Sequence, residues 1–138
     1  MLLRVCLDTN VLVAAFATRG LCTDVLRTVL SEHELIIGEV ILDELRRVLS
    51  RKLRLPADRI LAAELVFEGI QVIPKPDSPS PIRIRDRADR WVLATALAGE
   101  ADVLVTGDED LLVVAADAPL KILSPRAFWE LLRGGVAR

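Results

Sequence analysis

The chain has 138 residues, of which 52% are hydrophobic and 28% charged, and its formal net charge is −2. This length suits one domain that buries roughly two thirds of its unfolded surface, and the apolar content excludes a disordered or disulfide-stapled chain. The charge also excludes a positive field over the whole domain, so nucleic-acid binding would have to depend on local arginine clusters at 46–54 and 83–90.

The start of the chain and its cysteines indicate the compartment. The first apolar run reaches Asp8 before a signal-peptide core or a membrane span could be completed. Cys6 and Cys22 both lie in apolar surroundings, so we expect buried, reduced thiols. We therefore expect a cytoplasmic protein with no membrane partner.

Apolar periodicity predicts strands and helices that alternate along the chain. In chain order we expect a strand at 2–7, a helix at 11–16, a helix from Thr23 after the break at Gly20, a strand at 35–37, helices at 39–54 and 56–68, and a strand at 70–73. A proline-rich loop follows at 74–81. Beyond it we expect a helix at 86–98, a strand at 103–105, a helix at 108–116, a strand at 120–123, and a helix at 124–132 capped by Ser124.

The alternation predicts the fold class. Strands that alternate with helices favour a parallel sheet with both faces covered. We expect an α/β protein, a three-layer α/β/α sandwich with a central, mainly parallel sheet of about five strands. The chain has neither internal repeats nor a composition shift outside the proline-rich loop, so residues 1–138 are expected to form a single domain.

Two aspartates occupy equivalent places in this pattern. Asp8 follows the first predicted strand and precedes a helix, and Asp108 follows the strand at 103–105 in the same way. Because strand ends of one polarity lie along one edge of a parallel sheet, both side chains should emerge at the same edge. Each aspartate could be only a helix cap, but the repetition of the pattern favours a site.

Further acids fall on predicted helices. Glu44 borders an apolar stripe and is expected to face inward or nearly so, and Asp89 precedes Leu93 on the buried side of its helix. Asp86 lies one turn before Asp89 and could be a helix cap, a supporting group or a ligand. A surface ion pair between Asp43 and Arg47 is expected from their i,i+4 spacing.

Carboxylates that converge need a cation or raised pKa values. Two of them at about 4 Å repel by about 4 kcal/mol at an effective dielectric constant near 20. Oxygen ligands select Mg²⁺ or Mn²⁺, whereas zinc is disfavoured because His33 is the single histidine and is expected to be a solvated loop residue. The sequence lacks the glycine motifs of serine hydrolases and of nucleoside triphosphatases, so metal-activated water remains, which suits phosphodiester hydrolysis.

Four segments in this order resemble the signatures of the PIN-domain family. They are LDTNVL at 7–12, LDEL at 42–45, DRADR at 86–90 with ATAL at 94–97, and LVTGD at 104–108. The resemblance covers nearly the whole chain and is closest to the VapC-like toxin components of toxin–antitoxin pairs. It implies a Mg²⁺- or Mn²⁺-dependent endoribonuclease that acts on RNA, commonly forms a homodimer and is held inactive by a cognate antitoxin protein.

The resemblance also implies roles for individual residues. The acidic residues of the family fall on Asp8, Glu44, Asp89 and Asp108. We expect Asp8, Asp89 and Asp108 to hold one or two ions and Glu44 to act through water, with Asn10 and Thr106 orienting the first and last carboxylates. The chain departs from the family pattern around Asp86, which leaves the division of roles between Asp86 and Asp89 open. Asp110 is a second candidate beside Asp108, although a solvated role is expected for it.

Arginines near the acids could contact the RNA backbone. Arg85, Arg87 and Arg90 lie beside the cluster, and Arg46, Arg47 and Arg51 could extend the path, although each fits a solvated helix face equally well. Two other functions stay open. One is a PIN-like protein-binding module with a weak or silent site. The other is a phosphatase-type α/β enzyme, although such an enzyme requires a second acid at the position of Asn10. A receiver-like domain would require a second aspartate beside Asp8.

Overall fold

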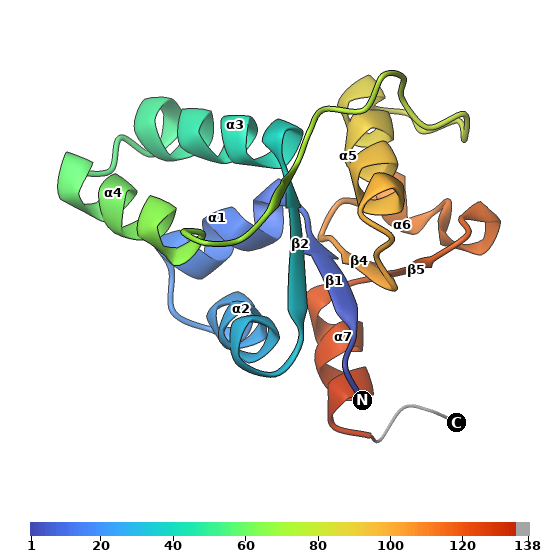
Figure 1. The fold of residues 1–138 in the computed structure, drawn as a ribbon, viewed down its shortest axis with the longest axis horizontal. Coiled ribbons are helices and arrows are strands. Elements are labelled where there is room, and N and C mark those ends of the chain that lie inside the picture. The colour runs from blue at the N-terminus through green and yellow to red at the C-terminus, as the bar shows by residue number, and fades with distance from the viewer. Residues whose placement is uncertain (135–138) are drawn as a thin grey trace.

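A computed structural model describes residues 1–134, in which five strands form one sheet (Figure 1). Every neighbouring pair is parallel, and the strand order is β3-β2-β1-β4-β5. The strands are β1 (Arg4–Leu7), β2 (Glu34–Gly38), β3 (Val72–Ile73), β4 (Val103–Val105) and β5 (Lys121–Leu123). In the centre, Val5 of β1 is in register with Leu35 and with Val103. The predicted α/β class and parallel sheet are confirmed.

Helices cover both faces of the sheet. They are α1 (Thr9–Ala17), α2 (Leu21–Glu32), α3 (Glu39–Arg47), α4 (Ala57–Val66), α5 (Arg87–Ala98), α6 (Glu109–Leu112) and α7 (Pro125–Leu132). Figure 1 shows α5 on one side of the β1 and β2 ribbons and α2 on the other, where α2 also contacts α7. Consecutive residues Val5, Cys6 and Leu7 are at most 1% exposed, as expected for a strand covered on both faces.

Local sequence explains where several helices begin. Ser124 caps α7, its hydroxyl accepting a hydrogen bond from the Ala127 N–H at 3.1 Å, and Pro125 takes the first helical position, which confirms the predicted cap. The carboxylates of Asp8, Asp86 and Asp108 accept hydrogen bonds from N–H groups at the starts of α1, α5 and α6. Three acids of interest are therefore also helix caps.

The close packing of α5 on the sheet depends on a glycine. A Cβ atom at Gly38, the last residue of β2, would collide with the Cγ2 atom of Thr95 in α5 and would lie 3.3 Å from the carbonyl oxygen of Ile73. The missing side chain lets α5 lie tightly against the end of β2. This packing brings the first turn of α5, which carries Asp89, to the carboxyl edge of the sheet.

Two predicted helices are shorter than expected. The helix predicted at 39–54 ends at Arg47 and continues as one π-helical turn, η1 (Val48–Lys52), whose wide turn keeps Leu49 buried. The helix predicted at 108–116 is only α6, followed by the short 3-10 helix η2 (Ala115–Asp117). The β-branched pair Val113 and Val114 disfavours further α-helix there. The strand predicted at 70–73 is reduced to β3.

Two predictions about side chains were wrong. His33 does lie in the loop between α2 and β2, but it is half-buried rather than solvated, and its Nδ1 atom accepts a hydrogen bond from the Leu3 N–H at 3.1 Å. Asp43 does not pair with Arg47. Instead both arginines pair with the acid three residues earlier in the chain. Arg46 lies 3.6 Å from Asp43, and Arg47 lies 3.3 Å from Glu44.

The cysteines and the helix lengths complete the picture. Both thiols are free; Cys6 is buried and Cys22 is half-buried. Burial raises the pKa of the Cys6 thiol far above its usual value, and the nearby Asp8 carboxylate adds to this, so Cys6 stays an uncharged core residue. Among residues 1–134, every helix is too short or too polar to cross a membrane.

Candidate metal centre

The carboxyl edge of the sheet holds a pocket lined with acids. Asp8 follows β1 and Asp108 lies just beyond β4, while α3 and α5 bring Glu44 and Asp89 from the other parts of the chain. The pocket has a volume of about 140 Å³ and is lined by Asp8, Thr9, Asn10, Val40, Glu44, Asp86, Ala88, Asp89, Val92 and Asp108. The structure thus brings the four acids singled out in the sequence, and also Asp86, into one cavity.

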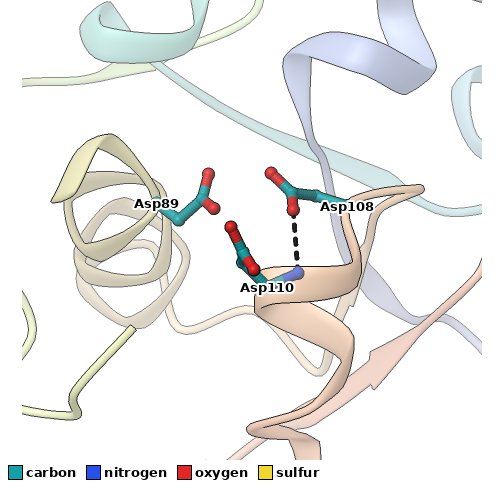
Figure 2. A group of neighbouring side chains, drawn as sticks. All are labelled: Asp89, Asp108 and Asp110. Carbon is teal, nitrogen blue, oxygen red and sulfur yellow. Dashed lines mark hydrogen bonds between the residues drawn. The ribbon is translucent and has the colours of Figure 1, made fainter. Parts of the chain in front are cut away.

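Three aspartates form the tightest group. Oxygen atoms of Asp89, Asp108 and Asp110 lie within 4.8 Å of one another, and Figure 2 shows Asp89 reaching from α5 toward the start of α6. The Asp110 N–H donates a hydrogen bond to Asp108 Oδ1 at 2.9 Å, which orients that carboxylate. Asp110, for which a solvated role was expected, is half-buried, and its carboxylate lies near those of Asp89 and Asp108.

The buried carboxylate of Asp89 is only partly satisfied by hydrogen bonds. Asp89 is only 6% exposed, and its Oδ2 atom has no hydrogen-bond partner within residues 1–134. The pKa of Asp89 is raised from 3.8 to about 8, mainly by burial and then by the hydrogen bond and charge of Asp108 and the charges of Asp8 and Asp86. An unsatisfied buried oxygen among carboxylates is the environment that a bound cation would relieve.

Asp8 is buried but well supported. It is 4% exposed, its Oδ1 accepts a hydrogen bond from the Thr9 N–H at 2.7 Å, and its Oδ2 accepts one from the Thr106 hydroxyl at 2.8 Å. Burial raises its pKa to about 6, and these two hydrogen bonds oppose the rise, whereas the charges of Glu44 and Asp108 add to it. At neutral pH Asp8 therefore remains mostly ionised and adds negative charge to the pocket.

Thr106 and Asn10 connect the ends of β1 and β4. The Thr106 hydroxyl donates to Asp8 and accepts a hydrogen bond from the Asp108 N–H at 2.9 Å, so one oxygen orients two acids. The Asn10 amide donates to Asp8 Oδ2 at 3.4 Å and accepts from the Gly107 N–H at 3.0 Å. These contacts fix the two strand ends relative to each other.

Glu44 and Asp86 lie at the rim of the pocket. The Glu44 side chain is 40% exposed and forms an ion pair with Arg47, so it is less buried than its place in the sequence suggested. Asp86 is exposed and accepts a hydrogen bond from the Ala88 N–H at 2.9 Å, which makes it the cap of α5. Asp89 rather than Asp86 thus belongs to the buried group.

The arginines chosen from the sequence divide into two kinds. Arg90 and Arg46 are engaged in the fold: Arg90 Nε donates to the carbonyl of Ser80 at 2.9 Å and holds the proline-rich loop, and Arg46 Nε donates to Glu64 at 2.6 Å. Arg85 and Arg87 are exposed beside Asp86 at the rim. Arg47 pairs with Glu44. Of the six arginines predicted along the RNA path, Arg51, Arg85 and Arg87 are exposed and form neither an ion pair nor a side-chain hydrogen bond within residues 1–134.

Comparisons with known proteins give a family and a fold. The family model described as the PIN domain matches residues 4–110. A chain in the crystal structure of VapBC2 from Rickettsia felis bound to a DNA fragment from their promoter has 16% sequence identity and a TM-score of 0.62, covering 88% of this chain and 98% of that one. At that identity the likeness shows a shared fold. Among curated proteins, no sequence matches this chain.

Proposed function

Because this chain belongs to the PIN-domain family, we propose that it is a Mg²⁺- or Mn²⁺-dependent endoribonuclease that hydrolyses RNA phosphodiester bonds. PIN domains are in general metal-dependent nucleases. The observation that carries the proposal is the group of Asp89, Asp108 and Asp110, with one buried Asp89 oxygen that no donor satisfies. These three aspartates would hold the ion, and two of them, Asp89 and Asp108, line the pocket that Asp8 and Glu44 also line.

The donor set fits a hard cation. Every candidate ligand is a carboxylate oxygen, which favours Mg²⁺ or Mn²⁺ over zinc. When bound, the ion would lower the pKa of a water molecule and stabilise charge on the phosphoryl oxygens. Asp8, held by Thr106, would keep the pocket negative, and Glu44 at the rim would bind the ion through water or help to position the attacking water. Arg85 and Arg87 are positioned to contact the RNA backbone beside the pocket.

An assay with an isosteric variant tests the proposal. Asp8→Asn should lower the rate of RNA cleavage by at least about a thousandfold, because it removes a charge facing the ion in a site where the ion supplies several kcal/mol. Asp58→Asn makes the same charge change on exposed α4 and should leave the rate unchanged. The assay compares single-stranded and structured RNA with and without Mg²⁺. Full cleavage by the Asp8→Asn protein, with contaminating nuclease excluded, would refute the assignment.

The link between the two strand ends has a test of its own. Thr106→Val keeps the shape of the side chain but removes the hydroxyl that orients Asp8 and receives the Asp108 N–H. Loss of such support should weaken Mn²⁺ binding by about 10–100-fold, measured by calorimetry. Thr106→Ser retains the hydroxyl and should bind nearly as well as the wild type. Equal affinity in the Val variant would show that this contact does not position the site.

The proposed protein partners are an antitoxin and a second copy of this chain. We propose that the chain is the toxin of a toxin–antitoxin pair, acts in the cytoplasm, and forms a homodimer, with residues 1–138 as a single domain. The likeness to a chain of a VapBC2 assembly supports this, and Leu61 and Leu65, 57% and 55% exposed on α4, offer apolar surface to a partner. A small antitoxin-like reading frame beside this one, whose product copurifies and blocks cleavage, is the expected result.

One alternative is favoured by the same exposed leucines. A PIN-like protein-binding module with a silent site would keep the fold and the apolar surface without using the acids. Mn²⁺ titration separates the two readings, because the three aspartates of a nuclease should bind the ion measurably and Asp89→Asn should abolish that binding.

A further inference from the structure

We propose that a second cavity, built around Arg19, Arg27 and Arg59, binds backbone phosphates of the RNA chain whose cleavage takes place at the aspartate pocket. This inference rests on the proposed function and adds a binding site to it. The cavity has a volume of about 650 Å³ and is lined by Ala15, Phe16, Ala17, Thr18, Arg19, Gly20, Thr23, Asp24, Arg27 and Arg59. It lies where α1 ends, α2 begins and α4 starts.

The charge in this cavity is opposite to that of the whole chain. Three arginines line it against a single acid, Asp24, while the chain has a net charge of −2. Asp24 neutralises Arg27 only weakly, since their nearest charged atoms are 4.0 Å apart and both side chains are more than half exposed. Guanidinium groups present paired N–H donors that match two phosphate oxygens, so arginines are well suited to hold a phosphodiester.

The end of α1 does not offset this positive charge. Three of its last four carbonyl groups accept hydrogen bonds from side chains: the Thr18 hydroxyl donates to Ala14, the Thr23 hydroxyl to Ala15, and Arg59 Nη2 to Phe16 at 3.1 Å. These three oxygens, which would otherwise repel a phosphate, are therefore engaged. Arg59 is also held in place by its bond, which leaves Arg19 and Arg27 as the side chains able to turn toward a ligand.

A single helix joins the two cavities. Asp8 caps the start of α1 at the aspartate pocket, and Ala17 ends α1 at the arginine cavity. The nine residues of α1 rise about 13 Å, and Figure 1 shows α1 leading from the strand ends toward the segment before α2. Asn10 lines the first cavity and Ala17 the second, and their spacing of seven residues places them on one face of the helix. An RNA chain that is cut at the aspartate pocket can therefore run along α1 to the arginine cavity.

Binding of RNA by catalytically inactive protein tests this arrangement. An Asp8→Asn background with Mn²⁺ present leaves the RNA uncut but keeps the three aspartates proposed to hold the ion. In it, the double variant Arg19→Ala, Arg27→Ala should bind a single-stranded RNA of about ten nucleotides roughly tenfold more weakly. Two lost phosphate contacts should also make the slope of log affinity against log salt shallower by about 1.4. An RNA of about two nucleotides, too short to span α1, should lose much less affinity. The matched control, Arg126→Ala with Arg133→Ala, removes two exposed arginines of α7 and its cap and should change neither quantity.

The outcomes separate this inference from the proposed function. If the Asp8→Asn protein with Mn²⁺ binds the longer RNA and the Arg19, Arg27 double variant binds it with unchanged affinity and salt slope, the inference is overturned while the nuclease proposal stands. If the double variant loses affinity for polyglutamate but not for RNA, the cavity serves an acidic protein partner and the inference is again wrong. If the Asp8→Asn protein with Mn²⁺ binds neither RNA, both proposals fail.

Discussion

Asp89→Asn should abolish RNA cleavage and at the same time make the metal-free protein more stable at pH 8. Cleavage should fall by at least about a thousandfold, because the variant loses a ligand of an ion that contributes several kcal/mol to the reaction. Stability should rise because the wild-type carboxyl group, with its pKa raised to about 8, must be partly ionised in a buried site beside Asp108. Each unit of pKa shift corresponds to about 1.4 kcal/mol, so a gain of about 2 kcal/mol or more is expected.

Urea denaturation in EDTA at pH 8, together with the cleavage assay in Mg²⁺, measures both effects. Asp58→Asn again serves as the control, since Asp58 is exposed and the same charge is removed. It should change neither the midpoint nor the rate. A less stable Asp89→Asn protein would mean that the buried carboxylate contributes to folding through contacts, and the stored electrostatic repulsion proposed here would be wrong.

Removal of divalent ions should make stability depend steeply on pH. The pKa of Asp8 is raised from 3.8 to about 6 and that of Asp89 to about 8, so between pH 4 and 8 the folded protein binds more protons than the unfolded chain. Stability contributed by these two groups is therefore complete below about pH 4 and is lost as the pH rises through about 6 and then about 8. Bound Mn²⁺ should reverse the loss, adding about 2.7 kcal/mol at a hundredfold excess over its dissociation constant.

Denaturation midpoints across this pH range, with EDTA and with Mn²⁺, give the result. The double variant Asp8→Asn, Asp89→Asn removes both titrating groups and should flatten the curve in EDTA. It should also abolish the response to Mn²⁺. A wild-type curve that is flat in EDTA, or that rises toward pH 8, would show that the two acids are not desolvated together as the structure places them.

Sequence patterns predicted most of the fold because they record local preferences. Apolar runs and their periods gave the order of strands and helices, and the parallel sheet followed from their alternation. The position of an acid just after a strand was enough to place Asp8 and Asp108 at one edge, because every parallel strand ends there. Ser124 was predicted as a helix cap from its own chemistry, and the structure confirms it.

Contacts between helices, strands and loops that are distant in the chain could not be predicted from sequence patterns. Periodicity tells which side of a helix faces the core, but not which neighbour it meets there, so the half-buried position of Asp110 near Asp89 and Asp108 was missed. The same reason applies to Arg46 and Arg90, whose partners Glu64 and Ser80 lie on other segments. The η1 turn was missed as well, because a helix pattern does not show when a π turn will replace the last α-helical one.

The sequence by itself determined the fold class, the order of the elements and the set of acids at the sheet edge, because helix periods, caps and strand ends are properties of neighbouring residues. Only the tertiary structure decided which acids form the close group, which arginines stay free and where a second, positively charged cavity opens. Those depend on distances between segments far apart in the chain, such as Asp89 and Asp108, or Phe16 and Arg59, and packing alone sets such distances.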